Sequence, residues 1–236
     1  TYAYLKVLFE HVDVKLSYFN QDFSTIDSND FTQLGATLGF PFQTQKWRIT
    51  PALHYTTRQL NAKDYQSTSG LQLDLKRYLG KGEYLRFRYR YTDVQSDNPD
   101  YDYLDGTRHR FRAEYVNATA IGRVRWRYEY EINDRQDTLL RNYSPTRHRL
   151  RLQLRNTLPA TLKMKNEIIF RNSVYEEDAA GFIRKDDRWQ YRFNLYTVPI
   201  SGLELGVRYT YTDNNSNQSS DIFSRNVKQG YLNWYF

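Results

Sequence analysis

The chain has 236 residues, a formal net charge of +7 and no cysteine; 39% of its residues are hydrophobic and 17% are aromatic. The absence of cysteine excludes disulfides and zinc–thiolate sites, and so many aromatic residues are atypical of a disordered chain. No run approaches the roughly 18 apolar residues of a membrane helix. A barrel strand, however, spans a bilayer with about 9 to 11 residues, of which only every second one must be apolar.

The first segment, residues 1–12, reads as a strand (TYAYLKVLFE), but it does not fit the strand count of the rest. From Val14 to Phe236 we count about twelve strands, and an even number is expected of a bacterial single-chain barrel. Fourteen strands stay possible. Residues 1–12 are therefore predicted to be an extra strand or the remnant of a preceding segment, and residues 1–236 a single barrel domain.

A 39-residue repeat organises the middle and end of the chain. Its marks are Thr107-Arg108, Thr146-Arg147, Lys185-Asp186 and Ser224-Arg225, and two of these begin the segments TRHRFRAEY and TRHRLRLQL. Charged and apolar residues alternate with a period of two, as they do in YLRFRYRY at 84–91 and RVRWRYEYEI at 123–132, which indicates strands with one basic and one apolar face. The repeat unit is thus a β-hairpin, and about six units fit the chain.

The connections between these strands alternate between short and long. Short ones lie at 43–46, 80–82, 119–122, 159–160 and 199–202; long polar ones lie at 25–30, 61–67, 97–106, 134–145, 176–182 and 213–221. Gly, Pro, Asn and Asp explain the turns. Strict alternation is typical of an outer-membrane barrel with short turns in the periplasm and long loops outside. The predicted fold is therefore all-β, a transmembrane antiparallel up-and-down β-barrel in the bacterial outer membrane.

The apolar face should contact lipid, with aromatic girdles at its two borders. The last segment, SRNVKQGYLNWYF, places Gly230, Leu232, Trp234 and Phe236 on one face and resembles the C-terminal strand signal of Gram-negative outer-membrane proteins. That resemblance implies a periplasmic C-terminal end and recognition of the last strand by the barrel-assembly machinery. The predicted membrane-interface residues are Trp47, Tyr89, Tyr91, Trp126, Tyr128, Tyr130, Tyr209, Tyr211, Trp234 and Phe236, with the bilayer and its lipopolysaccharide as partners.

The opposite face is strongly basic and should line the lumen. The predicted pore-lining residues are Arg86, Arg88, Arg90, Arg108, Arg110, Arg112, Arg123, Arg125, Arg127, Arg147, Arg149, Arg151, Arg155, Lys163, Lys165, Arg188, Arg192 and Arg208, with Arg171 on the same face. Inward acids are fewer: Asp74, Glu114, Glu129, Glu131, Glu167 and Glu204. Stacked like charges in a confined wall favour an anion in the lumen, and Arg binds carboxylate, phosphate or sulfate in bidentate fashion.

Two interpretations of this basic face stay open. It forms an anion pathway in which Arg88, Arg110, Arg125 and Arg149 are neighbouring sites on adjacent strands, or it forms structural ion pairs that fill the lumen. Candidate pairs are Glu114 with Arg125 or Arg127, and Glu129 or Glu131 with Arg108 or Arg110.

Other function classes fit less well. Nucleic-acid binding is disfavoured because arginines and aromatics lie on opposite faces of the same strands, so bases cannot stack where phosphates bind. A soluble sandwich or propeller would need shorter strands. His109 and His148 lie near Asp105 and Ser144 but point to the lipid side, so no catalytic site is predicted. A calcium site at Asp100, Asp102 and Asp105 lacks the later acidic ligand of an EF-hand loop, and neither metal nor cofactor is expected.

Twelve strands, an aromatic C-terminal strand and inward basic ladders resemble the oligogalacturonate-specific and sialic-acid-specific porins. This resemblance implies a narrow basic channel for anionic solutes, in particular acidic oligosaccharides. The TRHR strands and the last hairpin also resemble the C-terminal barrels of outer-membrane proteins that carry tetratricopeptide repeats, which implies export of polysaccharide or lipoprotein. An outer-membrane barrel enzyme is the third alternative.

Overall fold

The computed structural model describes residues 2–8, 12–21, 30–80, 82–136, 144–159, 161–178 and 180–234. They form one antiparallel sheet in which each strand pairs with the next along the chain, except that β3 and the short β4 both pair with β5. The strands are β1 (Tyr2–Leu8), β2 (Asp13–Gln21), β3 (Phe31–Gly39), β4 (Phe42–Gln43), β5 (Trp47–Leu60), β6 (Lys63–Gly80), β7 (Glu83–Ser96), β8 (Gly106–Thr119), β9 (Gly122–Arg135), β10 (Pro145–Thr157), β11 (Lys163–Glu177), β12 (Ile183–Ile200), β13 (Leu203–Ser216) and β14 (Phe223–Trp234).

In the part of the chain that the structure describes, the short 3₁₀ helices η2 (Pro99–Leu104) and η3 (Ser219–Asp221) lie in the connections after β7 and β13. Within the described ranges, no helix has the length and apolar character needed to cross a membrane.

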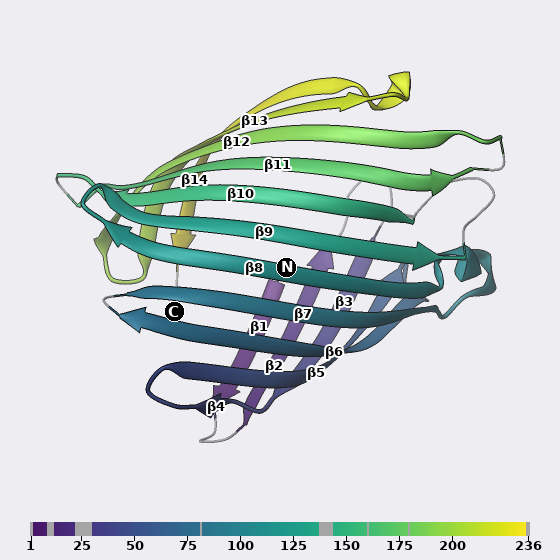
Figure 1. The fold of residues 1–236 in the computed structure, drawn as a ribbon, viewed down its shortest axis with the longest axis horizontal. Helices are drawn as coiled ribbons and strands as arrows, with labels where there is room; N and C mark the ends of the chain where they lie inside the picture. The colour runs from purple at the N-terminus through teal and green to yellow at the C-terminus, as the bar shows by residue number, and fades with distance from the viewer. Residues whose placement is uncertain are drawn as a thin grey trace.

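The sheet curls so that β1, β2, β3 and β14 pass behind the wall formed by β7 to β10 (Figure 1). This is the predicted antiparallel up-and-down β-barrel. Twelve long strands, β2, β3 and β5 to β14, lie between Asp13 and Trp234, as the sequence predicted. The two-residue β4 continues the line of β3 along β5. Strand β1, which precedes these twelve strands in the sequence, pairs with β2.

The exposure of the side chains shows which face of the sheet is apolar and which is charged. Leu71, Phe111 and Leu150 are 56%, 46% and 47% exposed, whereas Glu114 and Glu167 are 4% and 1% exposed. A soluble protein has the opposite distribution. Because the apolar side chains point outward from the curled sheet and the carboxylates point inward, the outer face is suited to hydrocarbon and the inner face to water.

Where the described residues show them, the connections at 43–46, 80–82, 119–122 and 199–202 are short and those at 97–106 and 213–221 are longer, as predicted. Most of the predicted loops at 25–30 and 134–145 lies outside the described residues, and the connections after β10 and after β11 are of equal length. One predicted loop is absent. Residues 61–67 were predicted to form a long polar loop, but β5 ends at Leu60 and β6 begins at Lys63. Asn61 and Ala62 form a two-residue turn with φ of 53° and 58°, the geometry that matches the twist of a hairpin. The prediction was wrong because the polar residues after Ala62 alternate inside β6 instead of leaving the sheet.

Candidate functional site

The strand register places the basic side chains of β7 to β12 on the inner face in transverse rows. In one row, Arg88 lies opposite Arg112, and Arg112 lies opposite Glu129. The row continues through Arg149, Arg171 and Arg188 on β10, β11 and β12. We call this inner surface of β6 to β12 the arginine face. Its rows arise because side chains two apart on a strand point the same way and antiparallel partners point together.

Each inward carboxylate of the first half of this face is shared by two arginines. Asp74 Oδ2 lies 2.5 Å from both Arg86 and Arg88. Glu114 is 2.5 Å from Arg127 and 3.8 Å from Arg125, and it accepts a hydrogen bond of 3.0 Å from the Tyr84 hydroxyl.

The two glutamates of β9 join its neighbours on both sides. Glu129 contacts Arg112 on β8 at 2.5 Å and Arg149 on β10 at 3.3 Å. Glu131 likewise contacts Arg110 on β8, and Arg147 on β10 at 3.1 Å. Both carboxylates are about 5% exposed, so these contacts offset much of the desolvation of the charges.

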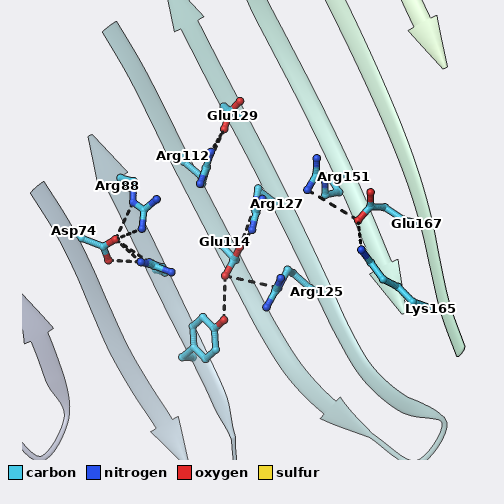
Figure 2. A network of polar contacts seen from close by, with 12 residues as sticks. Asp74, Arg88, Arg112, Glu114, Arg125, Arg127, Glu129, Arg151, Lys165 and Glu167 are labelled. Atoms are coloured by element: carbon cyan, nitrogen blue, oxygen red, sulfur yellow. Dashed lines mark hydrogen bonds and ion pairs between the residues drawn. The ribbon is translucent and has the colours of Figure 1, made fainter. Parts of the chain in front are cut away.

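Glu167 on β11 contacts more basic side chains than the other four carboxylates do. It is 1% exposed and lies 4.0 Å from Arg151, 3.5 Å from Lys165 and 3.3 Å from Arg192. Four carboxylates with two cations each and one with three therefore hold eleven basic side chains; Figure 2 shows most of this network. Each group keeps a net positive charge.

Other basic residues of the face have no carboxylate within ion-pair distance among the residues that the structure describes. Arg90 donates to His54 at 3.1 Å and Arg188 to Asn214 at 2.9 Å. Lys163 lies over Tyr196, and Arg208 over Tyr231. The full set on β6 to β12 is Lys76, Arg90, Arg108, Arg123, Arg155, Lys163, Arg171 and Arg188, while Arg208 lies beside it on β13. The predicted ion pairs and the predicted cationic excess are therefore both present on one surface.

The register corrects one detail of the predicted ladder. Arg88, Arg110, Arg125 and Arg149 lie on adjacent strands but not in one row. Arg110 lies opposite Arg90, and Arg125 lies opposite Val116 and Gln153, nearer the short-turn end. Of the predicted pairs, Glu131 with Arg110 is present, whereas Glu129 pairs with Arg112 and Arg149. Turn lengths set these registers, and the period of two cannot reveal them.

The inner surface of β3 and β5 differs from the arginine face because it carries small neutral side chains such as Thr37, Thr50 and Ala52. Between them and β7 lies a cavity of about 530 Å³. It is lined by Asp13, Lys15, Thr37, Gly39, Arg48, Thr50, Ala52, His54, Gln72, Asp74, Lys76, Tyr78, Arg86, Arg88 and Arg90. Most of these residues were not predicted as site residues, because an isolated His or Thr in a strand gives no signal before the register is known.

The predicted interface aromatics occupy the outer face. Trp47, Trp126, Tyr128 and Trp234 are 40%, 47%, 44% and 58% exposed. Tyr89, Tyr91, Tyr130, Tyr209 and Tyr211 are half-buried among their neighbours on this face. Phe236 lies outside the described residues.

His109 and His148 also belong to the outer face, as predicted. Their Nδ1 atoms lie 2.9 Å from the Tyr89 hydroxyl and 2.7 Å from the Tyr128 hydroxyl, respectively. These contacts place both imidazoles in the aromatic surface.

The acidic loop after β7 is organised by its own backbone. Asp105 accepts a hydrogen bond from the Ser96 backbone N–H, and its own N–H donates to Asp102 at 3.0 Å. The Asn98 side chain caps η2 by accepting from Asp100. No group of three or more metal-ligating side chains occurs in the described part of the chain.

No protein-family model and no curated protein matches the sequence. Among solved structures, the chain is similar to the outer-membrane porin OccAB3 of Acinetobacter baumannii, with a TM-score of 0.59 and 12% identity. The fold is that of an outer-membrane β-barrel. The likeness covers 97% of this chain and 65% of the OccAB3 chain, so the chain spans about two thirds of that porin's length. OccK3 of Pseudomonas aeruginosa is also similar, with a TM-score of 0.45, 12% identity and coverage of 97% and 79%. The outer-membrane location predicted from the sequence agrees with this fold.

Proposed function

We propose that the protein is an outer-membrane channel whose lumen conducts small anionic solutes, and that acidic oligosaccharides are the class it serves. The observation that supports this most directly is the charge balance of the arginine face. Five carboxylates share eleven basic side chains, Asp186 on β12 pairs with Arg184, and eight further basic residues have no carboxylate partner among the described residues. A wall that only filled the lumen with structural ion pairs would have balanced charges.

The chemistry of this wall suits mobile anions. The shared carboxylates hold arginines in fixed orientations, so little side-chain entropy is lost when an anion contacts them. A guanidinium fork matches a carboxylate, and the rows place further forks on neighbouring strands, about 4.8 Å apart per strand. An extended polyanion can therefore move between weak, repeated sites, which serves conduction better than one tight site.

The number of strands predicts a lumen whose width agrees with this proposal. Barrels of eight strands are filled by side chains, and those of sixteen or more enclose open channels. A barrel of twelve long strands lies between these limits, which suits single extended chains or small solutes.

Selectivity in planar bilayers tests the proposal. The protein should prefer chloride over potassium in a potassium chloride gradient, and the preference should weaken from 0.1 M to 1 M salt as the screening length falls to about 3 Å. Replacing Arg108, Arg171 and Arg188 by Gln should shift the reversal potential toward zero, because it removes three inward charges without leaving a described carboxylate unpaired.

A matched control removes the same charge from the outer face. Arg77, Lys185 and Lys228 are exposed on that face, and their replacement by Gln should leave the reversal potential unchanged. Cation preference in the parent protein, or equal shifts in both triple variants, would refute a selective arginine face.

A further inference from the structure

The 39-residue repeat is broken at two positions of the inner face. Strand β9 repeats β7 at this offset: Arg86 and Arg88 correspond to Arg125 and Arg127, and the outward tyrosines also coincide. However, where β9 has Glu129 and Glu131, β7 has Arg90 and Thr92.

The exchange removes the carboxylates from one place on the face. Arg110 has Glu131 on its β9 side, but on its β7 side it lies opposite Arg90. A neutral group takes the place of the missing acids. His54 Nε2 accepts a hydrogen bond of 3.1 Å from Arg90 Nε and lies 3.2 Å from the Thr92 hydroxyl. One imidazole thus contacts both residues at which the repeat is broken.

A glycine makes this contact possible. His54 lies on β5, and the register runs from His54 through Gly70 on β6 to Thr92 on β7. The imidazole crosses β6 above Gly70, where a Cβ atom would lie 2.5 Å from the ring carbon Cε1. The His54 residue is 6% exposed. The ring is therefore firmly held, and it fixes the Arg90 side chain through Nε.

Arg90 reaches the 530 Å³ cavity with its fork uncommitted. Six basic residues and two carboxylates line this cavity, which leaves four positive charges in excess. Asp13 is bound by Arg48, and Asp74 by Arg86 and Arg88. By contrast, within the described ranges the terminal nitrogens of Arg90 make no hydrogen bond. Thr37, Thr50 and Gln72 add neutral polar groups to the lining.

We propose that this cavity is a binding site for a single carboxylate-bearing sugar unit, in which Arg90 binds the carboxylate and His54 acts as the positioning residue. The proposal rests on the proposed function, because the ligand reaches the cavity through the lumen. The volume lies in the range of small-molecule sites. Threonine hydroxyls and the Gln72 amide can bind sugar hydroxyls, and the Arg90 fork supplies a charge-assisted pair.

Block of the chloride current tests the site in the full chain in planar bilayers. Glucuronate is the probe, glucose is its neutral counterpart, and inorganic phosphate tests for a site that takes any oxyanion. Glucuronate should block with a saturating dose dependence, and glucose should not. Arg90→Gln should raise the half-blocking concentration of glucuronate at least about tenfold, the effect expected of one lost charge-assisted interaction.

The His54 variants separate positioning from general structure. His54→Ala should raise the half-blocking concentration severalfold, whereas His54→Gln should stay within about twofold of the parent because its amide oxygen can accept from Arg90 Nε. Arg77→Gln, on the outer face, should leave the block unchanged. An unaltered block in Arg90→Gln, or equal weakening in both His54 variants, would overturn the assignment.

One further result would also overturn the proposed site. Block by phosphate without block by glucuronate would overturn the sugar-sized site. Loss of anion preference is read from the reversal potential, not from the block, so failure of the proposed function is distinguishable from failure of this site.

Discussion

At the scale of single residues, the carboxylates of β9 should affect both the stability of the barrel and its ion selectivity. Glu129→Gln removes the negative charge that Arg112 and Arg149 share and leaves one neutral acceptor oxygen in place of two charged ones. Because both arginines are partly exposed, we expect a loss of about 2 kcal/mol in the free energy of unfolding. The same change removes an inward negative charge and should increase anion preference. Urea unfolding in lipid vesicles and reversal potentials measure the two effects.

Asp213→Asn provides the control for this prediction, because Asp213 pairs with Trp189 in the register and so belongs to the outward set of β13. It should change neither measurement appreciably. If Glu129→Gln were as stable as the parent, the shared carboxylates would not stabilise the wall.

The sequence predicted the residues of the arginine face but not their contacts. Alternation alone assigns Arg110, Arg112 and Arg125 to one face, since a period of two needs no knowledge of neighbours. Pairing depends on register, which is fixed by turns and bulges such as the shift between Tyr78 and Gly80. His54 could not be predicted as a partner of Arg90, because the two are joined across a third strand.

At the scale of elements, the turn between β5 and β6 contains a strained backbone conformation that a single substitution should relieve. Ala62 has a φ of 58°, a conformation that costs a residue with a Cβ about 1–2 kcal/mol and costs glycine little. Ala62→Gly should therefore increase the free energy of unfolding by about 0.5–1 kcal/mol, after the larger chain entropy of glycine is subtracted. Ala62→Val should lower it. Denaturant unfolding of both variants gives the comparison, and a loss of stability in Ala62→Gly would contradict it.

Strand positions were predicted well where charged and apolar residues alternate strictly, as in β7 to β10. The prediction failed at residues 63–67, where Lys63, Asp64 and Gln66 resemble a loop by composition. The reason is physical: polar residues at the long-loop end of a barrel strand are exposed to water on either face, so β-pairing continues without an apolar signal.

At the scale of the whole molecule, depth in the apolar belt should determine the effect of outward charges. Leu73 lies at the middle of the outward residues of β6, while Thr57 is the outward polar residue that follows Tyr55 on β5. Leu73→Arg should cost about 2–4 kcal/mol of folding free energy in a bilayer, and Thr57→Arg no more than about 1 kcal/mol. Equal costs, measured by unfolding from vesicles, would show that the exposed apolar face is not covered by lipid.

The 39-residue hairpin repeat also bears on how such a barrel changes in size. A unit of two strands and two connections returns the chain to the same end of the barrel with the same face inward, as the coincidence of Arg86 with Arg125 and of Tyr89 with Tyr128 illustrates. Gain or loss of one whole unit therefore alters the circumference of the barrel by two strands. Every remaining side chain still faces the same environment, lipid or water, as before. Pore diameter in such a lineage can change by duplication and deletion of a module, independently of point substitutions on the inner face.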